Sequence, residues 1–289
     1  MKAPVNKLIP FSSVDGPGNR TSVFLQGCNF NCRYCHNPET RALCQNCGEC
    51  VAGCPSGALS FAPASGENGG RKNRVRFELS RCIGCDHCIR VCRHNASPRI
   101  RWMEPAEVYA EVQKNVPFIR GVTVSGGECT LYPVFLRELG RLCLSDGLSY
   151  LLDSNGSYDF SEDSAGLLPY IDGVMLDVKA WSGGDHFRAA YVGNEAVKKN
   201  MRYLAGQGKL TEVRTVVVPG LFDAEETVRE TARALLPYLA KQPIRYKIIA
   251  YRPMGVREEY RVYRSPDAET LQRLAGIARQ EGMEDIVLI

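Results

Sequence analysis

Thirteen cysteines dominate the chemistry open to this 289-residue sequence, and eleven of them fall into three groups. The first group, "CNFNCRYC", spaces Cys28, Cys32 and Cys35 as C-x3-C-x2-C. Thiolates are ligands of iron–sulfur clusters, zinc or Cu(I). A [4Fe–4S] cluster is ordinarily held by four thiolates, so three on one short loop leave one iron free to bind a substrate. We therefore interpret this group as the ligands of a catalytic cluster.

The alternative for this group is a structural zinc site with Cys44 as the fourth ligand. Structural zinc sites usually pair two C-x2-C elements, whereas the first group contains a C-x3-C step. Its position also favours a catalytic cluster. It directly follows a strand-like segment, residues 20–27, and the ends of parallel strands carry the chemistry of α/β barrels.

The other two groups are copies of one pattern, C-x2-C-x2-C-x3-C, beginning at Cys44 and Cys82. Bacterial two-cluster ferredoxins have this pattern, and in them the fourth cysteine of each run binds the other cluster. Fully ligated clusters cannot bind a substrate, so we expect this pair to move single electrons; zinc knuckles are the alternative. The predicted [4Fe–4S] ligands are Cys44, Cys47, Cys50 and Cys92 for one cluster and Cys82, Cys85, Cys88 and Cys54 for the other.

Some residues near these patterns depart from them or stand outside them. Pro55 follows the first run as the ferredoxin pattern requires, but Arg93 stands at that place after the second run, where we expect an altered potential or stability. Cys129 and Cys143 belong to no group and are expected to be packing residues. Four histidines show no metal-ligand spacing: His36, His87, His94 and His186.

The bulk composition is that of an ordinary globular protein, with 24% charged and 44% hydrophobic residues. A net charge of +4 is too small to argue for nucleic acid. The N-terminal residues lack the apolar stretch of a signal peptide, and no run approaches membrane-spanning length. We therefore expect a cytoplasmic protein without nucleic-acid or membrane partners, in a reducing compartment where grouped thiols bind metals.

Outside residues 41–100, β-branched segments alternate with helix-like ones, which indicates parallel strands joined by crossover helices. Six such units, with a seventh strand-like run at 285–289, predict an α/β fold of the partial (β/α)6 barrel type. The strand segments are 20–27, 121–127, 150–156, 172–179, 212–220 and 245–251, and helix-like segments include 104–116, 133–144 and 225–239.

Residues 41–100 differ from the rest, because they hold eight cysteines and a Gly/Asn/Ser-containing loop at 61–74. We predict an inserted bacterial-ferredoxin-like (α+β) domain here, with 1–40 and 101–289 forming the barrel core. Basic residues suggest a docking face for an acidic electron donor, and a plain solvated surface is the alternative. These residues are Arg71, Lys72, Arg74, Arg76, Arg81, Arg90 and Arg93.

Three polar motifs end predicted strands: "VSGGE" (124–128), "LDSNG" (152–156) and "MLDVK" (175–179). Because carboxyl ends of parallel strands share one edge of a sheet, we expect these motifs near the first cysteine group. The glycines permit a close backbone approach, and Glu128 can accept a hydrogen bond from an ammonium group. Taken alone, the GGE motif is better explained by a plain tight turn, and the charged residues of the other two motifs are explained equally well by an ion pair that braces the barrel mouth.

Together these motifs resemble a known superfamily. C-x3-C-x2-C after one strand and GGE after the next resemble radical S-adenosylmethionine (SAM) enzymes, in which the open iron chelates the amino and carboxylate groups of SAM. "SVDGPGNR" (13–20), "CHNPE" (35–39) and "VRTVVVPG" (213–220) narrow the resemblance to activating enzymes of glycyl-radical enzymes, most of all to the YjjW type of activase.

The resemblance implies roles for particular residues. Tyr34 matches an aromatic position near the adenine, with loop packing as the alternative. Activases commonly have a histidine where this chain has Arg252, a permanent cation that can bind but cannot act as a base. The implied SAM contacts are Tyr34, Cys35, His36, Gly126, Gly127, Glu128, Asp153, Ser154, Asp177, Val178, Lys179, Arg214 and Arg252. A monovalent cation is implied at Asp153, Ser154, Met175 and Asp177, and a partner-facing turn at Asp15, Gly16, Pro17 and Gly18.

The implied activity is the reductive cleavage of SAM to methionine and a 5′-deoxyadenosyl radical, which abstracts hydrogen from a backbone glycine of a partner glycyl-radical enzyme. No side chain acts as an acid or base in this scheme. The implied cofactors are three [4Fe–4S] clusters, SAM and a monovalent cation, with a flavodoxin- or ferredoxin-type electron donor. One alternative is a radical SAM enzyme with a small-molecule or other peptide substrate. Another is an electron-transfer ferredoxin fused to an inactive barrel, which the intact C-x3-C-x2-C and GGE motifs oppose.

Overall fold

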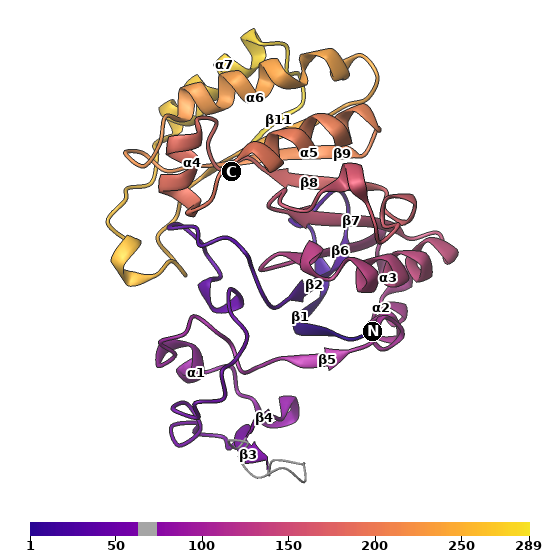
Figure 1. Cartoon of the computed structure of the whole chain (residues 1–289), viewed down its shortest axis with the longest axis vertical. Helices are drawn as coiled ribbons and strands as arrows, with labels where there is room; N and C mark the ends of the chain where they lie inside the picture. Colours follow the sequence, from indigo (N-terminus) through magenta and orange to yellow (C-terminus); the bar gives the residue numbers. More distant parts are fainter. Residues whose placement is uncertain (63–73) are drawn as a thin grey trace.

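A nine-stranded sheet organises most of the chain in the computed structural model, which describes residues 1–62 and 74–289 (Figure 1). Its strand order is β11-β10-β9-β8-β7-β6-β2-β1-β5. Neighbours from β2 to β11 are parallel, and β1 and β5 extend the sheet as antiparallel strands. The strands are β1 (Ala3–Ser12), β2 (Arg20–Leu25), β5 (Arg101–Met103), β6 (Gly121–Gly126), β7 (Ser149–Ser154), β8 (Gly173–Asp177), β9 (Leu210–Val217), β10 (Arg245–Ala250) and β11 (Ile286–Leu288).

Helices connect the parallel strands and cover the outer face of the sheet (Figure 1). The connection from β7 to β8 contains only 3-10 helices. The α-helices are α1 (His87–Arg90), α2 (Pro105–Gln113), α3 (Pro133–Ser145), α4 (Gly183–Ala190), α5 (Glu195–Gly206), α6 (Ala224–Leu239) and α7 (Ala268–Gln280). The 3-10 helices are η1 (Pro38–Thr40), η2 (Leu79–Arg81), η3 (Val116–Phe118), η4 (Cys129–Leu131), η5 (Phe160–Glu162), η6 (Leu168–Tyr170) and η7 (Glu258–Tyr260).

The predicted partial barrel is confirmed, since all six predicted parallel strands and the seventh at the C-terminal end are present. Local chemistry explains the first crossover helix: Pro105 occupies its first turn, and Glu104 and Glu107 form a reciprocal capping box. Its apolar side chains, such as Val108 and Val112, are buried in the core between sheet and helices. Cys129 and Cys143 are buried in the same core, as predicted. Among the described helices, none is long and apolar enough to cross a membrane.

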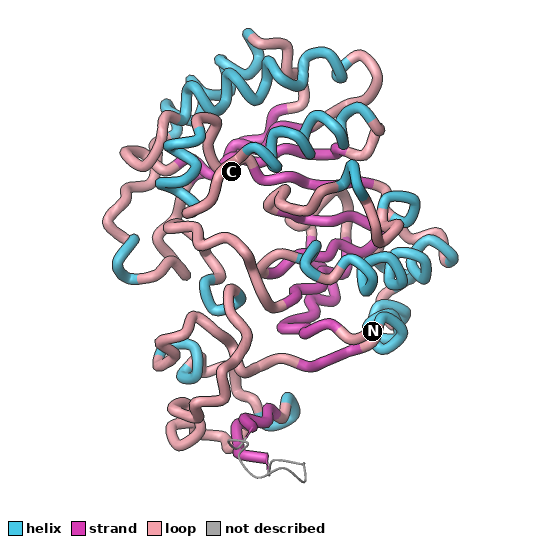
Figure 2. The backbone as a smooth tube through the Cα atoms, viewed as in Figure 1, coloured by secondary structure: helices cyan, strands magenta, loops and turns pink. Residues whose placement is uncertain are grey.

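Residues 41–100 leave the barrel between β2 and β5 and contain little regular structure (Figure 2). Two short antiparallel strands, β3 (Leu59–Ala62) and β4 (Arg74–Phe77), form a separate sheet beside helix α1. The interior of the predicted 61–74 loop, residues 63–73, lies outside the described residues. A bridge between Ala42 and Ala96 brings the two ends of this segment side by side. We call residues 41–100 the insert from here on.

Candidate active site

A cleft opens at the carboxyl ends of the parallel strands, with about 890 Å³ of open space. The three cysteines of the first group line it together with the ends of β6, β7 and β8. The predicted meeting of motifs from four strands is therefore observed. Its lining includes Cys28, Cys32, Tyr34, Cys35, His36, Ser125, Gly126, Gly127, Glu128, Asp153, Ser154, Asn155, Asp177 and Lys179.

The barrel itself holds the loop that carries these three cysteines. Arg257, from the segment after β10, donates from Nη2 to the carbonyl oxygen of Cys32 at 3.1 Å. Contacts from several distant segments of the barrel thus hold the loop in position. Backbone N–H groups of the loop donate to the carbonyl oxygens of other segments: Gly27 to Thr40 (2.8 Å), Cys28 to Arg41 (2.8 Å), Asn31 to Ala190 (3.1 Å) and Arg33 to Ala189 (2.9 Å).

The two glycines of the GGE motif are required by the close approach of neighbouring backbone. Gly126 has a φ of +123°, and a Cβ there would lie 2.1 Å from the carbonyl oxygen of Leu25. A Cβ at Gly127 would lie 2.2 Å from the carbonyl oxygen of Gly27. Larger residues would therefore push the cysteine loop away from the end of β6. The close backbone approach predicted for these glycines is thus made by the protein's own chain.

Glu128 joins the ends of β6 and β7. Its carboxylate is buried and accepts hydrogen bonds from the backbone N–H of Asn155 at 2.6 Å and the hydroxyl of Ser154 at 2.9 Å. The backbone N–H and hydroxyl of Thr130 also donate to it, at 3.1 and 2.5 Å. Burial raises the pKa of Glu128, and these hydrogen bonds oppose the rise. Glu128, which is predicted to accept a hydrogen bond from an ammonium group, thus also stabilises the wall of the cleft.

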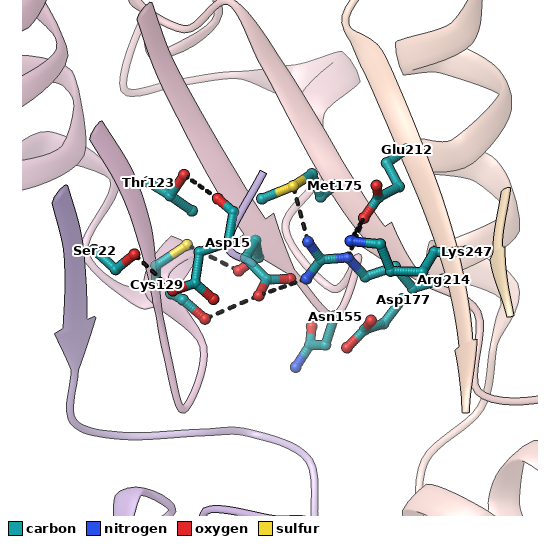
Figure 3. Close-up of polar contacts among 12 residues, drawn as sticks. Asp15, Ser22, Thr123, Cys129, Asn155, Met175, Asp177, Glu212, Arg214 and Lys247 are labelled. Carbon is teal, nitrogen blue, oxygen red and sulfur yellow. Dashed lines mark hydrogen bonds and ion pairs between the residues drawn. The ribbon is translucent and has the colours of Figure 1, made fainter. Parts of the chain in front are cut away.

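Ion pairs join acidic and basic side chains at β7 to β10 inside the barrel, and Figure 3 shows Glu212, Arg214 and Lys247 among them. Arg214 bridges Asp153 at 2.9 Å and Glu212 at 2.5 Å. Burial raises the pKa of Asp153, and Arg214 opposes that rise. The further pairs are Lys247 with Glu212 at 3.1 Å and Lys179 with Asp177 at 2.5 Å. The formal charges of this network therefore balance within the protein.

The predicted monovalent-cation residues already have protein partners in this network. Arg214 pairs with Asp153 and donates from Nη2 to the sulfur of Met175 at 2.9 Å. Asp177 pairs with Lys179, and Ser154 donates to Glu128. Within residues 1–62 and 74–289, no three His, Cys, Asp or Glu side chains are arranged around a single metal ion. The structure therefore brings these residues together, and each has a protein partner.

Some predicted SAM contacts lie elsewhere. The Arg252 side chain is exposed and does not line the cleft, and only its carbonyl oxygen contacts His36 Nε2, at 2.9 Å. Val178 is buried in the core and its N–H pairs with the carbonyl of Arg214 in the sheet. Sequence reasoning missed Arg257, because a residue after the last core strand gives no local signal that it reaches the cysteine loop.

Tyr34 lines the cleft and is also packed. Its side chain is 3% exposed and lies against Tyr251 and Val218 in a second apolar group. Its buried hydroxyl has no hydrogen-bond partner among the described residues. The ammonium of Lys179 lies 5.9 Å from its ring centroid. Tyr34 therefore lies at the cleft, where the resemblance placed it, and it also packs against neighbouring side chains, as the alternative predicted.

A second cavity beside the loop tests whether an iron–sulfur cluster fits. It is lined by the three cysteines, both GGE glycines, Arg41 and Arg257. The Nε–H groups of both arginines are buried without a partner in the described part of the chain. Unpaired buried donors are costly, and the sulfur atoms of an anionic cluster would accept their hydrogen bonds. The thiol set and these two donors fit a [4Fe–4S] cluster.

Burial keeps the cysteine loop in the thiol form when no metal is bound. It raises the pKa of Cys28 to about 12 and that of Cys32 to about 11. The pKa of Cys35 is raised by burial as well. Metal ligation requires the thiolate, so cluster assembly must release these protons.

The insert arranges its cysteines across the two runs. One cavity, with about 320 Å³ of empty space, is lined by Cys54 from the first run together with Cys82, Cys85 and Cys88 from the second. Burial, then the nearby thiols of Cys47 and Cys92, raise the pKa of Cys44. Both observations agree with the predicted exchange of the fourth ligand between the runs.

Family comparisons identify the class of protein. Residues 80–234 match the model of the Radical SAM superfamily, and residues 14–56 match a 4Fe-4S single cluster domain. Residues 43–96 match a 4Fe-4S dicluster domain. The fold, the cleft and these matches define a radical SAM protein with 4Fe-4S clusters. The zinc alternatives are therefore wrong.

Relatives narrow the class further. The indoleacetate decarboxylase activating enzyme of Tractidigestivibacter scatoligenes is 28% identical over 99% of this chain and 98% of its own length. The isethionate sulfite-lyase activating enzyme of Nitratidesulfovibrio vulgaris is 30% identical over 93% of each chain. The (2S)-3-sulfopropanediol sulfolyase activating enzyme of Bilophila wadsworthia is 31% identical over 85% of this chain and 83% of its own. The chain belongs to the glycyl-radical enzyme activating enzymes.

Solved structures support the fold. QueE from Escherichia coli matches 100% of this chain and 94% of its own with a TM-score of 0.52 and 12% identity. A radical SAM methyltransferase from Sphaerobacter thermophilus matches 93% of this chain and 66% of its own with a TM-score of 0.52 and 14% identity.

The protein is therefore an oxidoreductase. It cleaves SAM reductively to methionine and a 5′-deoxyadenosyl radical, which takes a hydrogen atom from a backbone glycine of a glycyl-radical enzyme. The predicted family and activity are confirmed, and neither alternative activity is needed.

Proposed function

We propose that SAM binds in the cleft at the strand ends, beside a [4Fe–4S] cluster held by Cys28, Cys32 and Cys35. The observation that carries this assignment is the cavity in which the three thiols face two buried, unpaired arginine donors. The chemistry supplied by the bound cluster and SAM is one-electron cleavage of the sulfonium. The protein orients the reactants and excludes water.

The cleft residues have suitable chemistry for SAM. Lys179 offers a cation to the SAM carboxylate, and Asp153 and Asp177 offer negative charge near its ammonium and sulfonium groups. Tyr34 and His36 provide ring faces in the same cleft. The remaining proposed contacts are Cys35, Gly126, Gly127, Glu128 and Ser154, with Arg214 positioning Asp153. Val178 and Arg252 are left out because neither lines the cleft. A monovalent cation at the predicted residues would have to compete with Arg214 and Lys179 for the two carboxylates.

We further propose three [4Fe–4S] clusters, two of them in the insert, residues 41–100, and one in the core, residues 1–40 and 101–289. The insert clusters would be held by Cys44, Cys47, Cys50 and Cys92 and by Cys82, Cys85, Cys88 and Cys54. The Cys54 cavity and the proximity of Cys44 to Cys92 support these sets. Fully loaded protein should contain about twelve iron atoms per chain, four for each cluster.

Electrons would reach the insert from a flavodoxin- or ferredoxin-type donor in the cytoplasm. Arg74 and Arg76 are exposed there, whereas Arg81 pairs with Glu78 and Arg93 with Glu49. Arg90 donates to the Cys85 carbonyl, and Arg71 and Lys72 lie outside the described residues. Reduction by an acidic donor should slow as ionic strength rises, and a rate that ignores salt would contradict this docking.

The proposed site is tested with anaerobically reconstituted protein, dithionite and SAM. We expect 5′-deoxyadenosine and methionine from wild type, and neither product from Cys32→Ala. Cys143→Ala is the matched control, because Cys143 is a buried cysteine outside every group. Adding the glycyl-radical enzyme should produce a glycyl radical in the electron paramagnetic resonance spectrum. Undiminished cleavage by Cys32→Ala would contradict the site.

A further inference from the structure

A groove larger than the SAM cleft runs between the barrel and the insert, with about 1590 Å³ of open space. The barrel side is formed by β1, β2 and the turn before β2, and includes Ile9, Asp15 and Phe24. The insert side includes Phe77 at the end of β4 and Leu79 in η2. The groove therefore exists only because the insert faces the barrel.

The groove is continuous with the SAM cleft. Asn37, Ser125 and Asp153 line both of them. Ser125 donates to Asp153 at 3.0 Å, so the two residues form one polar wall where the groove and the cleft meet. A chain lying in the groove therefore reaches the place where the proposed function puts SAM.

The barrel side suits an extended polypeptide. The edge strand β5 pairs only with Ala3–Val5 of β1, so the rest of β1 has no strand on that side among the described residues. Asp15 is fixed by Ser12 and Ser22, whose hydroxyls both donate to Oδ2 at 2.7 Å. Its Oδ1 has no recorded partner in residues 1–62 and 74–289 and can accept a main-chain N–H group. The two glycines that follow Asp15, with φ of +119° and +77°, give the turn this shape.

The insert side adds apolar surface. Leu79 is 57% exposed although it lies inside a groove, and Phe77 and Ile89 are half-buried beside it. Ile9 and Phe24 face the same space from the barrel. Apolar side chains on both walls of a polar-ended groove are typical of peptide-binding sites.

We propose that the insert forms one wall of the binding site for the partner's glycine-containing segment, with Leu79 as its main contact. The inference rests on the proposed function, since hydrogen abstraction from a backbone glycine requires main chain to enter the SAM cleft. The insert is then a recognition element as well as an electron carrier. A ferredoxin module with only an electron-transfer role would have no need of this wall.

The test compares Leu79→Asn with Val91→Asn, both in reconstituted full-length protein reduced by dithionite. Val91 is also an exposed apolar residue of the insert, at 38% exposure, and it does not line the groove. We expect Leu79→Asn to keep its iron and its SAM cleavage without partner, but to bind a peptide copying the partner's glycine segment about tenfold more weakly. Val91→Asn should bind it like wild type.

Equal peptide affinity of Leu79→Asn and wild type would overturn the inference. If wild type itself released no 5′-deoxyadenosine, the proposed function would fail instead, so the two failures are distinguishable. A photo-crosslinking peptide added to wild type gives a readout that needs no variant. Crosslinks to both β1 and residues 74–89 are expected, and crosslinks confined to the barrel would overturn the insert wall.

Discussion

The cysteine loop of the barrel and the two cysteine runs of the insert place the same thiol chemistry in different surroundings. In the barrel, Cys28, Cys32 and Cys35 lie on a loop that is hydrogen-bonded to several other segments. In the insert, Cys47 and Cys85 are exposed. The buried apolar residues of the insert are few, and two of the three in its own core are themselves cysteines, Cys50 and Cys88.

The difference shows two ways of building an iron–sulfur site. The barrel buries a large apolar core made of side chains from its strands and helices. The described residues of the insert contain two four-residue strands, the four-residue helix α1 and the 3-10 helix η2, too little regular structure to bury a stable core alone. Binding energy from the metal is then folding energy for the insert, as in other small metal-binding domains.

The largest expected effect is the difference in SAM cleavage between a variant of a barrel-loop cysteine and a variant of an insert cysteine. Cys32→Ala should lower dithionite-driven SAM cleavage by more than the roughly 100-fold that even a neighbour of a metal ligand can cost. Cys85→Ala should lose insert iron but keep most of this cleavage, because dithionite can bypass the insert. Product release measured by chromatography, with iron counted in parallel, checks both variants. Equal losses of SAM cleavage in the two variants would mean that the barrel site and the insert act as one functional unit.

Removing iron with a chelator should unfold the insert and leave the barrel folded. Hydrogen exchange measured by mass spectrometry should show loss of protection in residues 74–100 and retained protection in β6 to β10. The reason is that the core of the insert consists largely of its cluster ligands. Protection of the insert that survives complete iron removal would show that it folds independently.

Iron loading of the barrel site should improve as pH rises from 7 to 9. Burial raises the pKa of Cys28 and Cys32 to about 12 and about 11, so both are protonated in this range and must lose protons to bind iron. Each displaced proton adds about a factor of ten in affinity per pH unit. The Cys32→Ala variant, which loads only the insert, serves as the reference in a chelator competition. A barrel affinity that is independent of pH would mean that the thiols are already ionised.

The smallest predicted effect concerns Arg257, which lines the cavity of the cysteine loop and whose buried Nε–H has no partner among the described residues. Arg257→Met should lower the potential of the barrel cluster by on the order of 60 mV, because one cationic donor stabilises the reduced cluster. Arg264→Met, in the same segment and exposed, with no hydrogen bond or ion pair to residues 1–62 and 74–289, should leave the potential unchanged. A redox titration followed by electron paramagnetic resonance measures both. An unchanged potential in Arg257→Met would assign that residue to backbone support alone.

Local patterns sufficed to predict the parallel strands and the position of the first cysteine group beside the strand-end motifs. Strand periodicity and cysteine spacing are properties of short segments. Contacts between distant segments were not predictable in this way: Arg257 reaches the cysteine loop from more than two hundred residues along the chain, and Glu128 finds its partners on the next strand. β1 was missed because Pro4 and Pro10 interrupt its strand pattern.

The bridge between Ala42 and Ala96 bears on whether the insert can be removed from the protein. The two ends of the insert lie next to each other, so the chain leaves the barrel and returns to it at the same place. A version lacking residues 43–95 could be rejoined with a very short linker without moving the catalytic strands.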